Sequence, residues 1–68
     1  MNDINRQGAI FANNILAGYL TELLVGDKVF YTFQYVGAYL DSGVPIGHRF
    51  PLQSGPFEFD TFPAFFEN

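Results

Sequence analysis

An almost unbroken run of β-forming residues extends from Val29 to Val36, and its pattern predicts a central strand. Alternation puts Val29, Tyr31, Phe33 and Tyr35 on one face, which is entirely apolar or aromatic. The opposite face is mixed, as it would be if it were half covered. Because so much aromatic surface is tolerated only under cover, we expect another element to pack over this strand.

Residues 3–25 have a pattern that predicts one long amphipathic helix, because their apolar positions recur at about 100° per residue. The apolar side of this helix would carry Ile4, Phe11, Ala12, Ile15, Leu16, Tyr19, Leu20 and Leu23. The polar side would carry Asp3, Gln7, Asn13, Asn14 and Thr21. Gly26 then stands where a left-handed residue commonly ends a helix.

A second strand is expected over residues 44–50, after a short loop at residues 41–43 in which Gly43 suits a positive φ. Pro45 has no N–H to donate to a neighbouring strand, so this strand belongs at an edge. These elements predict an α+β fold. One N-terminal amphipathic helix would pack on a twisted antiparallel β-hairpin, followed by an extended Phe-rich C-terminal arm.

The segment FEFDTFPAFFEN, residues 57–68, contains five of the nine phenylalanines. Phe57 and Phe59 alternate with acidic residues, which suits a short strand, and Pro63 can begin a helical turn. Disordered tails contain few aromatic residues, so this segment must pack against something. We therefore expect one small α+β domain, residues 1–56, and an aromatic arm that packs on its own chain or on a neighbouring subunit. The candidate partner-binding residues are Phe57, Phe59, Phe62, Phe65 and Phe66.

The composition also favours a protein that does not act alone. Hydrophobic residues make up 49% of the 68, whereas only 15% are charged, against about 25% in an ordinary domain. The chain has no cysteine for a disulfide or a thiolate metal site. Association with other subunits is then the remaining way for a small domain to gain stability. We expect protein partners, in a homo-oligomer or a hetero-oligomer.

Charge and hydropathy argue against several other partners. A net charge of −4 with three cations is unsuited to nucleic acid, whose binding needs clustered Lys and Arg. The longest apolar segment, residues 10–25, is interrupted by polar residues and is shorter than the roughly 20 residues of a membrane-spanning helix. No signal-peptide pattern is present. We expect a soluble protein made in the cytoplasm, without membrane partners.

Residue chemistry gives no support for catalysis. His48 is the only imidazole, and a general base would need an orienting carboxylate, for which only Asp41 is near in sequence. Glu58 and Asp60 could hold a cation, but an exposed acidic face that keeps a Phe-rich segment soluble explains them more simply. We therefore expect no catalytic, cofactor-binding or metal-binding residues, no small-molecule substrate and no enzyme activity.

These inferences predict a non-catalytic structural or interaction subunit of a larger protein assembly. Large aromatic side chains dominate the energetics of protein interfaces, so the arm is the expected anchor. A minor virion component, from a capsid, decoration or tail, fits the size, the acidity and the absence of cysteine. The alternative is a small soluble inhibitor that blocks a host protein surface with the same aromatic residues.

Overall fold

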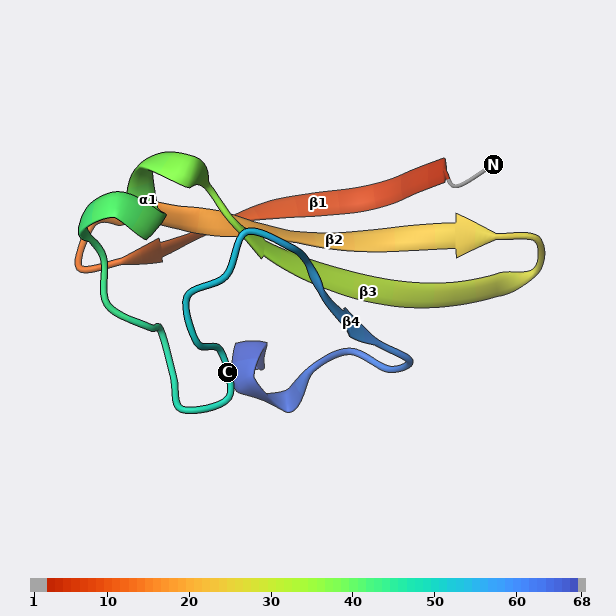
Figure 1. The fold of residues 1–68 in the computed structure, drawn as a ribbon. Helices are drawn as coiled ribbons and strands as arrows, with labels where there is room; N and C mark the ends of the chain where they lie inside the picture. Colours follow the sequence, from red (N-terminus) through yellow and green to blue (C-terminus); the bar gives the residue numbers. More distant parts are fainter. Residues whose placement is uncertain (1–2, 68) are drawn as a thin grey trace.

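The fold is an antiparallel sheet of four strands, covered on one face by a long loop, residues 43–56, and two short helical elements (Figure 1). The computed structural model describes residues 3–67. The strands are β1 (Asp3–Ala12), β2 (Ile15–Val25), β3 (Lys28–Tyr35) and β4 (Phe57–Phe59). Between β3 and β4 lies the helix α1 (Gly37–Ser42), and after β4 comes the 3₁₀ turn η1 (Ala64–Phe66). The sheet order β1-β2-β3-β4 places β3 inside the sheet.

The predicted helix over residues 3–25 is wrong, because this segment forms the hairpin of β1 and β2. The strands are joined at Asn13 and Asn14, whose φ angles of 53° and 67° are both left-handed. Two left-handed residues in a two-residue loop are typical of a type I′ turn, whose twist matches that of the flanking strands. Asparagine tolerates this conformation better than most residues, so Asn13 and Asn14 can form the turn of this hairpin.

The turn between β2 and β3 uses glycine in a similar way. Gly26 has a φ of +63°, and the pair Val25↔Lys28 closes the loop around Gly26 and Asp27. The type II′ hairpin turn prefers glycine at its first central position. The left-handed conformation expected at Gly26 is therefore present, but it connects two strands and does not end a helix.

The C-terminal half contains both confirmed and wrong predictions. The central strand is confirmed as β3, the short strand in the arm as β4, and the helical turn after Pro63 as η1. The strand expected over residues 44–50 is absent, and the fold is not the expected α+β arrangement of a helix on a hairpin. Side chains bond the backbone of this loop: the Ile46 N–H donates to the Tyr35 hydroxyl at 3.1 Å, and the Tyr39 hydroxyl donates to the Val44 carbonyl at 2.7 Å.

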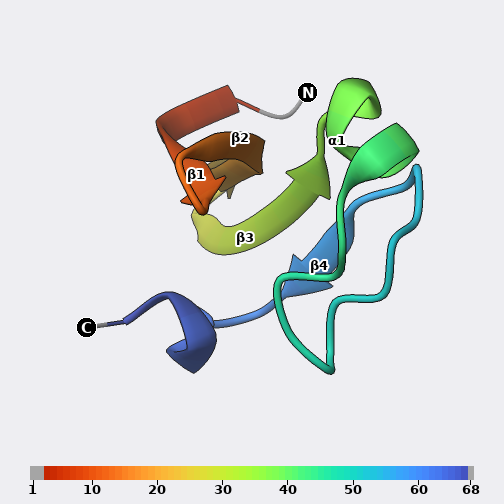
Figure 2. The same cartoon turned by 90° about the vertical axis from the view of Figure 1, so that its left-hand side faces the viewer.

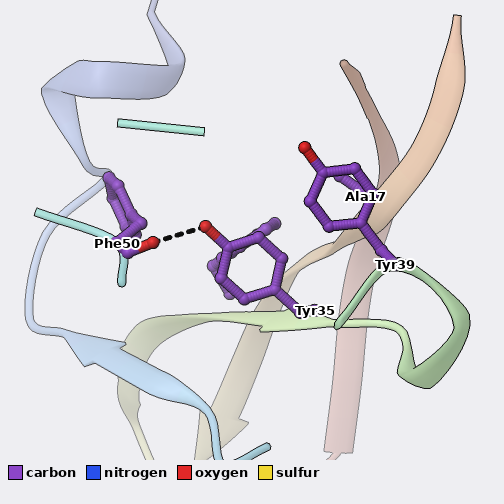
Figure 3. Packing of buried hydrophobic residues seen from close by; sticks show 5 residues of the cluster. Ala17, Tyr35, Tyr39 and Phe50 are labelled. Carbon is purple, nitrogen blue, oxygen red and sulfur yellow. Dashed lines mark hydrogen bonds between the residues drawn. The ribbon is translucent and has the colours of Figure 1, made fainter. Parts of the chain in front are cut away.

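The core lies between one face of the sheet and the covering loop. Its buried residues are Ala17, Phe33, Tyr35, Tyr39 and Phe50. The rings of Tyr35 and Tyr39 stack at 5.6 Å, and the Tyr35 hydroxyl donates to the carbonyl of Phe50 (Figure 3). The aromatic face predicted for the central strand is thus the face that packs, although it is covered by the loop and two short helical elements and not by one long helix.

A bulge in β2 presents a backbone carbonyl to the residue that precedes α1. Ile10 pairs with Gly18 whereas Phe11 pairs with Leu16, which leaves Ala17 as the extra residue. The carbonyl of Ala17 accepts the N–H of Val36 at 2.9 Å, just before α1 begins. The view in Figure 2 shows the sheet curving from β1 to β4, with α1 at the end of β3 and the loop running from α1 past β4. In residues 3–67 no helix is long and apolar enough to cross a membrane.

Candidate protein-interaction surface

Three of the five candidate phenylalanines face the core of their own chain. Phe57 and Phe59 lie in β4 and pair with Phe33 and Tyr31 of β3. Phe66, in η1, has its ring 5.3 Å from that of Phe33. All three pack against the buried cluster. The division of the chain at residue 57 stays a prediction, and residues 1–2 and 68 lie outside the described part.

The other two candidates, Phe62 and Phe65, face outward. Their side chains are 39% and 53% exposed. Phe62 contacts Tyr31 edge-to-face at 5.5 Å between ring centroids, and Phe65 rests against Phe50 at 5.0 Å. Each ring is therefore supported from behind while its outer side remains in solvent. We call the surface formed by Phe62 and Phe65 the arm surface.

Two acidic residues accompany Phe62 and Phe65 in the arm. Asp60 and Glu67 are exposed, and residues 57–68 contain no Lys or Arg. A hollow of about 530 Å³ lies beside Phe65, between η1 and the loop, with Arg49 on its border. The arm surface thus combines two exposed rings with exposed charged side chains beside them, an arrangement typical of an interface with a polar rim.

One ion pair lies beside Phe62, because Arg6, Glu22 and Phe62 line the same hollow on this sheet face. The Arg6 guanidinium donates to the Glu22 carboxylate at 2.6 Å, across the pairing of β1 with β2. This hydrogen bond, with a weaker one from the Asn5 amide, holds the pKa of Glu22 below its ordinary value. Glu22 is therefore ionised at neutral pH and balances the charge of Arg6.

The opposite face of the sheet, which the helical pattern of residues 3–25 did not indicate, also exposes large apolar side chains. Ile4 pairs with Leu23, and Tyr19 lies on the same face; Ile4 and Tyr19 are 62% and 38% exposed. Phe11, on this face of β1, is 61% exposed. A single helix over residues 3–25 would have placed these side chains against the strands. Reading Asn13-Asn14 as a turn would have revealed strand alternation instead.

The candidates for chemistry lie apart from one another. His48 is exposed on the loop, in a hollow lined by Pro45, Gly47, His48 and Pro51. Glu58 points to the opposite sheet face, because it pairs with Thr32 between Phe57 and Phe59. Within residues 3–67, no three His, Cys, Asp or Glu side chains are grouped closely enough to hold a metal ion.

Comparison with known proteins shows the family of the chain. Residues 8–68 match the protein family described as HipA N-terminal domain. No curated protein and no solved structure is significantly similar to the chain. The family is related to bacterial toxin–antitoxin systems, so the expectation of a viral virion component is wrong.

Proposed function

Because this chain belongs to the HipA N-terminal domain family, we propose that it is a non-catalytic domain that binds another protein through the arm surface. The family is related to kinases of toxin–antitoxin systems, and its name denotes one domain of larger proteins. The proposed partner is accordingly the kinase portion of a HipA-type protein. The observation that carries the proposal is the outward placement of Phe62 and Phe65 on a chain of this family.

The contacts behind the two rings support binding. Phe62 rests on Tyr31, and Phe65 rests on Phe50 and on Phe66, whose ring centroid is 5.2 Å away. Rings that are already held lose little conformational freedom when a partner covers them, which lowers the cost of association. Apolar anchors near the centre of an interface commonly supply most of its binding energy.

The charges around the rings suggest the chemistry of the partner surface. Asp60 and Glu67 are exposed and close in sequence to Phe62 and Phe65, without a cation in the same segment. A partner surface with apolar pockets bordered by Lys or Arg would complement them and speed association. Binding should therefore weaken as the salt concentration rises, because exposed charges are screened.

Calorimetric titration of the chain into the separately produced kinase portion of a HipA-type protein from the same organism tests the proposal. We expect the wild-type chain to bind and Phe62→Ser with Phe65→Ser to bind at least tenfold more weakly while remaining folded. The matched control is Ile4→Ser with Tyr19→Ser, which removes two exposed apolar side chains from the opposite sheet face and should leave affinity unchanged. No binding by the wild type, or an equal loss in the control, would contradict the proposal.

The non-catalytic part of the proposal has its own measurement. The exposed position of His48 on a loop, in a hollow whose other lining residues are Pro45, Gly47 and Pro51, supports it. The chain incubated with ATP and Mg²⁺ should release phosphate no faster than buffer does. Release that disappears on His48→Ala substitution would show that the domain catalyses a reaction.

A further inference from the structure

A hollow of about 290 Å³ lies on the covered face of the sheet, beyond the end of the covering loop. Its lining residues are Arg6, Gln7, Gly8, Leu20, Glu22, Tyr31 and Phe62. The pairings Gly8↔Leu20 and Arg6↔Glu22 place these four residues on one face of β1 and β2. The pairing Glu22↔Tyr31 continues the row into β3. Phe62 links the hollow to the arm surface.

The hollow is open because Gly8 has no side chain. A Cβ atom built on Gly8 would meet no other atom within 4 Å, and Gly8 does not have a positive φ. Gly18 differs, because a Cβ there would overlap the carbonyl oxygen of Gln34. Neither backbone conformation nor packing requires glycine at position 8, yet glycine inside a strand weakens it. Such departures from local preference are expected at functional sites.

The walls of the hollow favour an uncharged occupant. Leu20, Tyr31 and Phe62 supply apolar surface, and the rings of Tyr31 and Phe62 meet at 79°. The two charged groups present, Arg6 and Glu22, bind each other at 2.6 Å. A charged side chain would lose its hydration without gaining an unpaired counter-charge, whereas an apolar ring loses nothing of this kind.

The strand that carries Gly8 is at the edge of the sheet. Among the described residues β1 pairs only with β2, so the outer edge of β1 offers backbone donors and acceptors to an added strand. In an antiparallel or parallel addition, the residue beside Gly8 would project its side chain onto the face of the hollow. Aromatic side chains beside an edge glycine cover it and restore the lost stability.

We propose that the Gly8 hollow receives an uncharged aromatic side chain from an extended segment of the protein partner that pairs with the outer edge of β1. This inference rests on the proposed function, since it names the chemistry by which the partner would contact the region next to Phe62. A second copy of the chain is a different occupant, and the experiment below separates the two.

The direct test uses a peptide probe, acetyl-Thr-Thr-Phe-Thr-Thr-amide, titrated into the ¹⁵N-labelled 68-residue chain and followed by NMR. We expect saturable shifts in the amides of β1 and of Leu20, with an apparent affinity at least tenfold higher than for peptides with Ala or Lys at the centre. Gly8→Val fills the hollow and should abolish the shifts. Gly55→Val is the matched control, because a Cβ at Gly55 also meets no atom within 4 Å.

Each result decides the proposal. Equal binding of the three peptides, unchanged binding by Gly8→Val, or shifts confined to the opposite sheet face would overturn it. Self-association of the chain that Gly8→Val abolishes would identify a second copy as the occupant and would also overturn it. Should Gly8→Val fail to fold, Gly8→Ala and the peptide series on the wild type still decide. Peptide binding without binding of the kinase portion would contradict the proposed function alone. Binding of the kinase portion without peptide binding would contradict only the proposed occupant of the Gly8 hollow.

Discussion

The hydroxyl of Tyr35 donates a hydrogen bond to the backbone carbonyl of Phe50, and this bond fastens the covering loop to the central strand (Figure 3). The same hydroxyl accepts the N–H of Ile46 at 3.1 Å. Both Tyr35 and Phe50 are 3% exposed. One side-chain oxygen thus satisfies two backbone groups of a loop that has no strand partner.

Tyr35→Phe should destabilise the chain by about 1–3 kcal/mol, because it leaves a buried carbonyl and a partly buried N–H without partners. Urea unfolding followed by circular dichroism measures this loss. Tyr39→Phe is a suitable control, since the Tyr39 hydroxyl makes a single, part-buried bond to the carbonyl of Val44. The control should lose less stability than Tyr35→Phe. Equal losses would mean that Tyr35 has no special role in holding the loop.

The inward and outward phenylalanines of the arm should differ in their effects on stability. Phe66→Ala removes a ring that packs against Phe33 and Phe50, and we expect a loss of about 3 kcal/mol or more. Phe65→Ala removes a ring that is 53% exposed, and the loss should be about 1 kcal/mol. Thermal unfolding of the two variants makes the comparison. A larger loss for Phe65→Ala would contradict the orientation of η1.

The turn at Asn13 and Asn14 gives a prediction in the opposite direction. Both residues have left-handed φ angles, and Asn-Gly is the preferred pair in a type I′ turn. Asn14→Gly should therefore raise the midpoint of thermal unfolding, whereas Asn14→Val should destabilise by about 1–3 kcal/mol because a β-branched residue is strained there. If Asn14→Gly lowers the midpoint, the residues 3–25 do not form this hairpin.

The ion pair between Arg6 and Glu22 should make stability depend on pH. The hydrogen bond from Arg6 lowers the pKa of Glu22, so its contribution is full above the ordinary glutamate value of about 4.3 and disappears as pH falls below it. Thermal unfolding between pH 7 and pH 3 should show a smaller acid-induced loss in Glu22→Gln than in the wild type. Glu58→Gln, which removes an exposed carboxylate on the opposite sheet face, should retain the wild-type loss.

The sequence predicted the second half of the sheet better than the first. The run from Val29 to Val36 identified β3 because strand alternation continues through it without a break. In β1 and β2, register shifts between Ile4 and Arg6 and between Ile10 and Phe11 interrupt that alternation. The apolar positions on either side of these shifts then fit a helical period as well as a strand period. The turn at Asn13 was the signal that could have separated the two.

The loop after β3 could not be predicted from local pattern alone. Residues 44–50 alternate as a strand would. Their backbone is instead held by hydrogen bonds to the side chains of Tyr35 and Tyr39, which lie outside this segment. For the arm, composition predicted that its rings must pack, and three of the five, Phe57, Phe59 and Phe66, pack on their own chain. Only three-dimensional contacts separate the inward Phe66 from the outward Phe65, since adjacent positions in one short turn point in different directions.

Cross-saturation NMR on the complex tests the central claim most directly, by transferring saturation from the kinase portion of a HipA-type protein to the labelled chain. We predict signal loss at the Phe62 and Phe65 rings and along the outer edge of β1. Signal loss confined to Phe11, Tyr19 and Phe30 on the opposite sheet face, with Phe62 and Phe65 unaffected, would contradict the account.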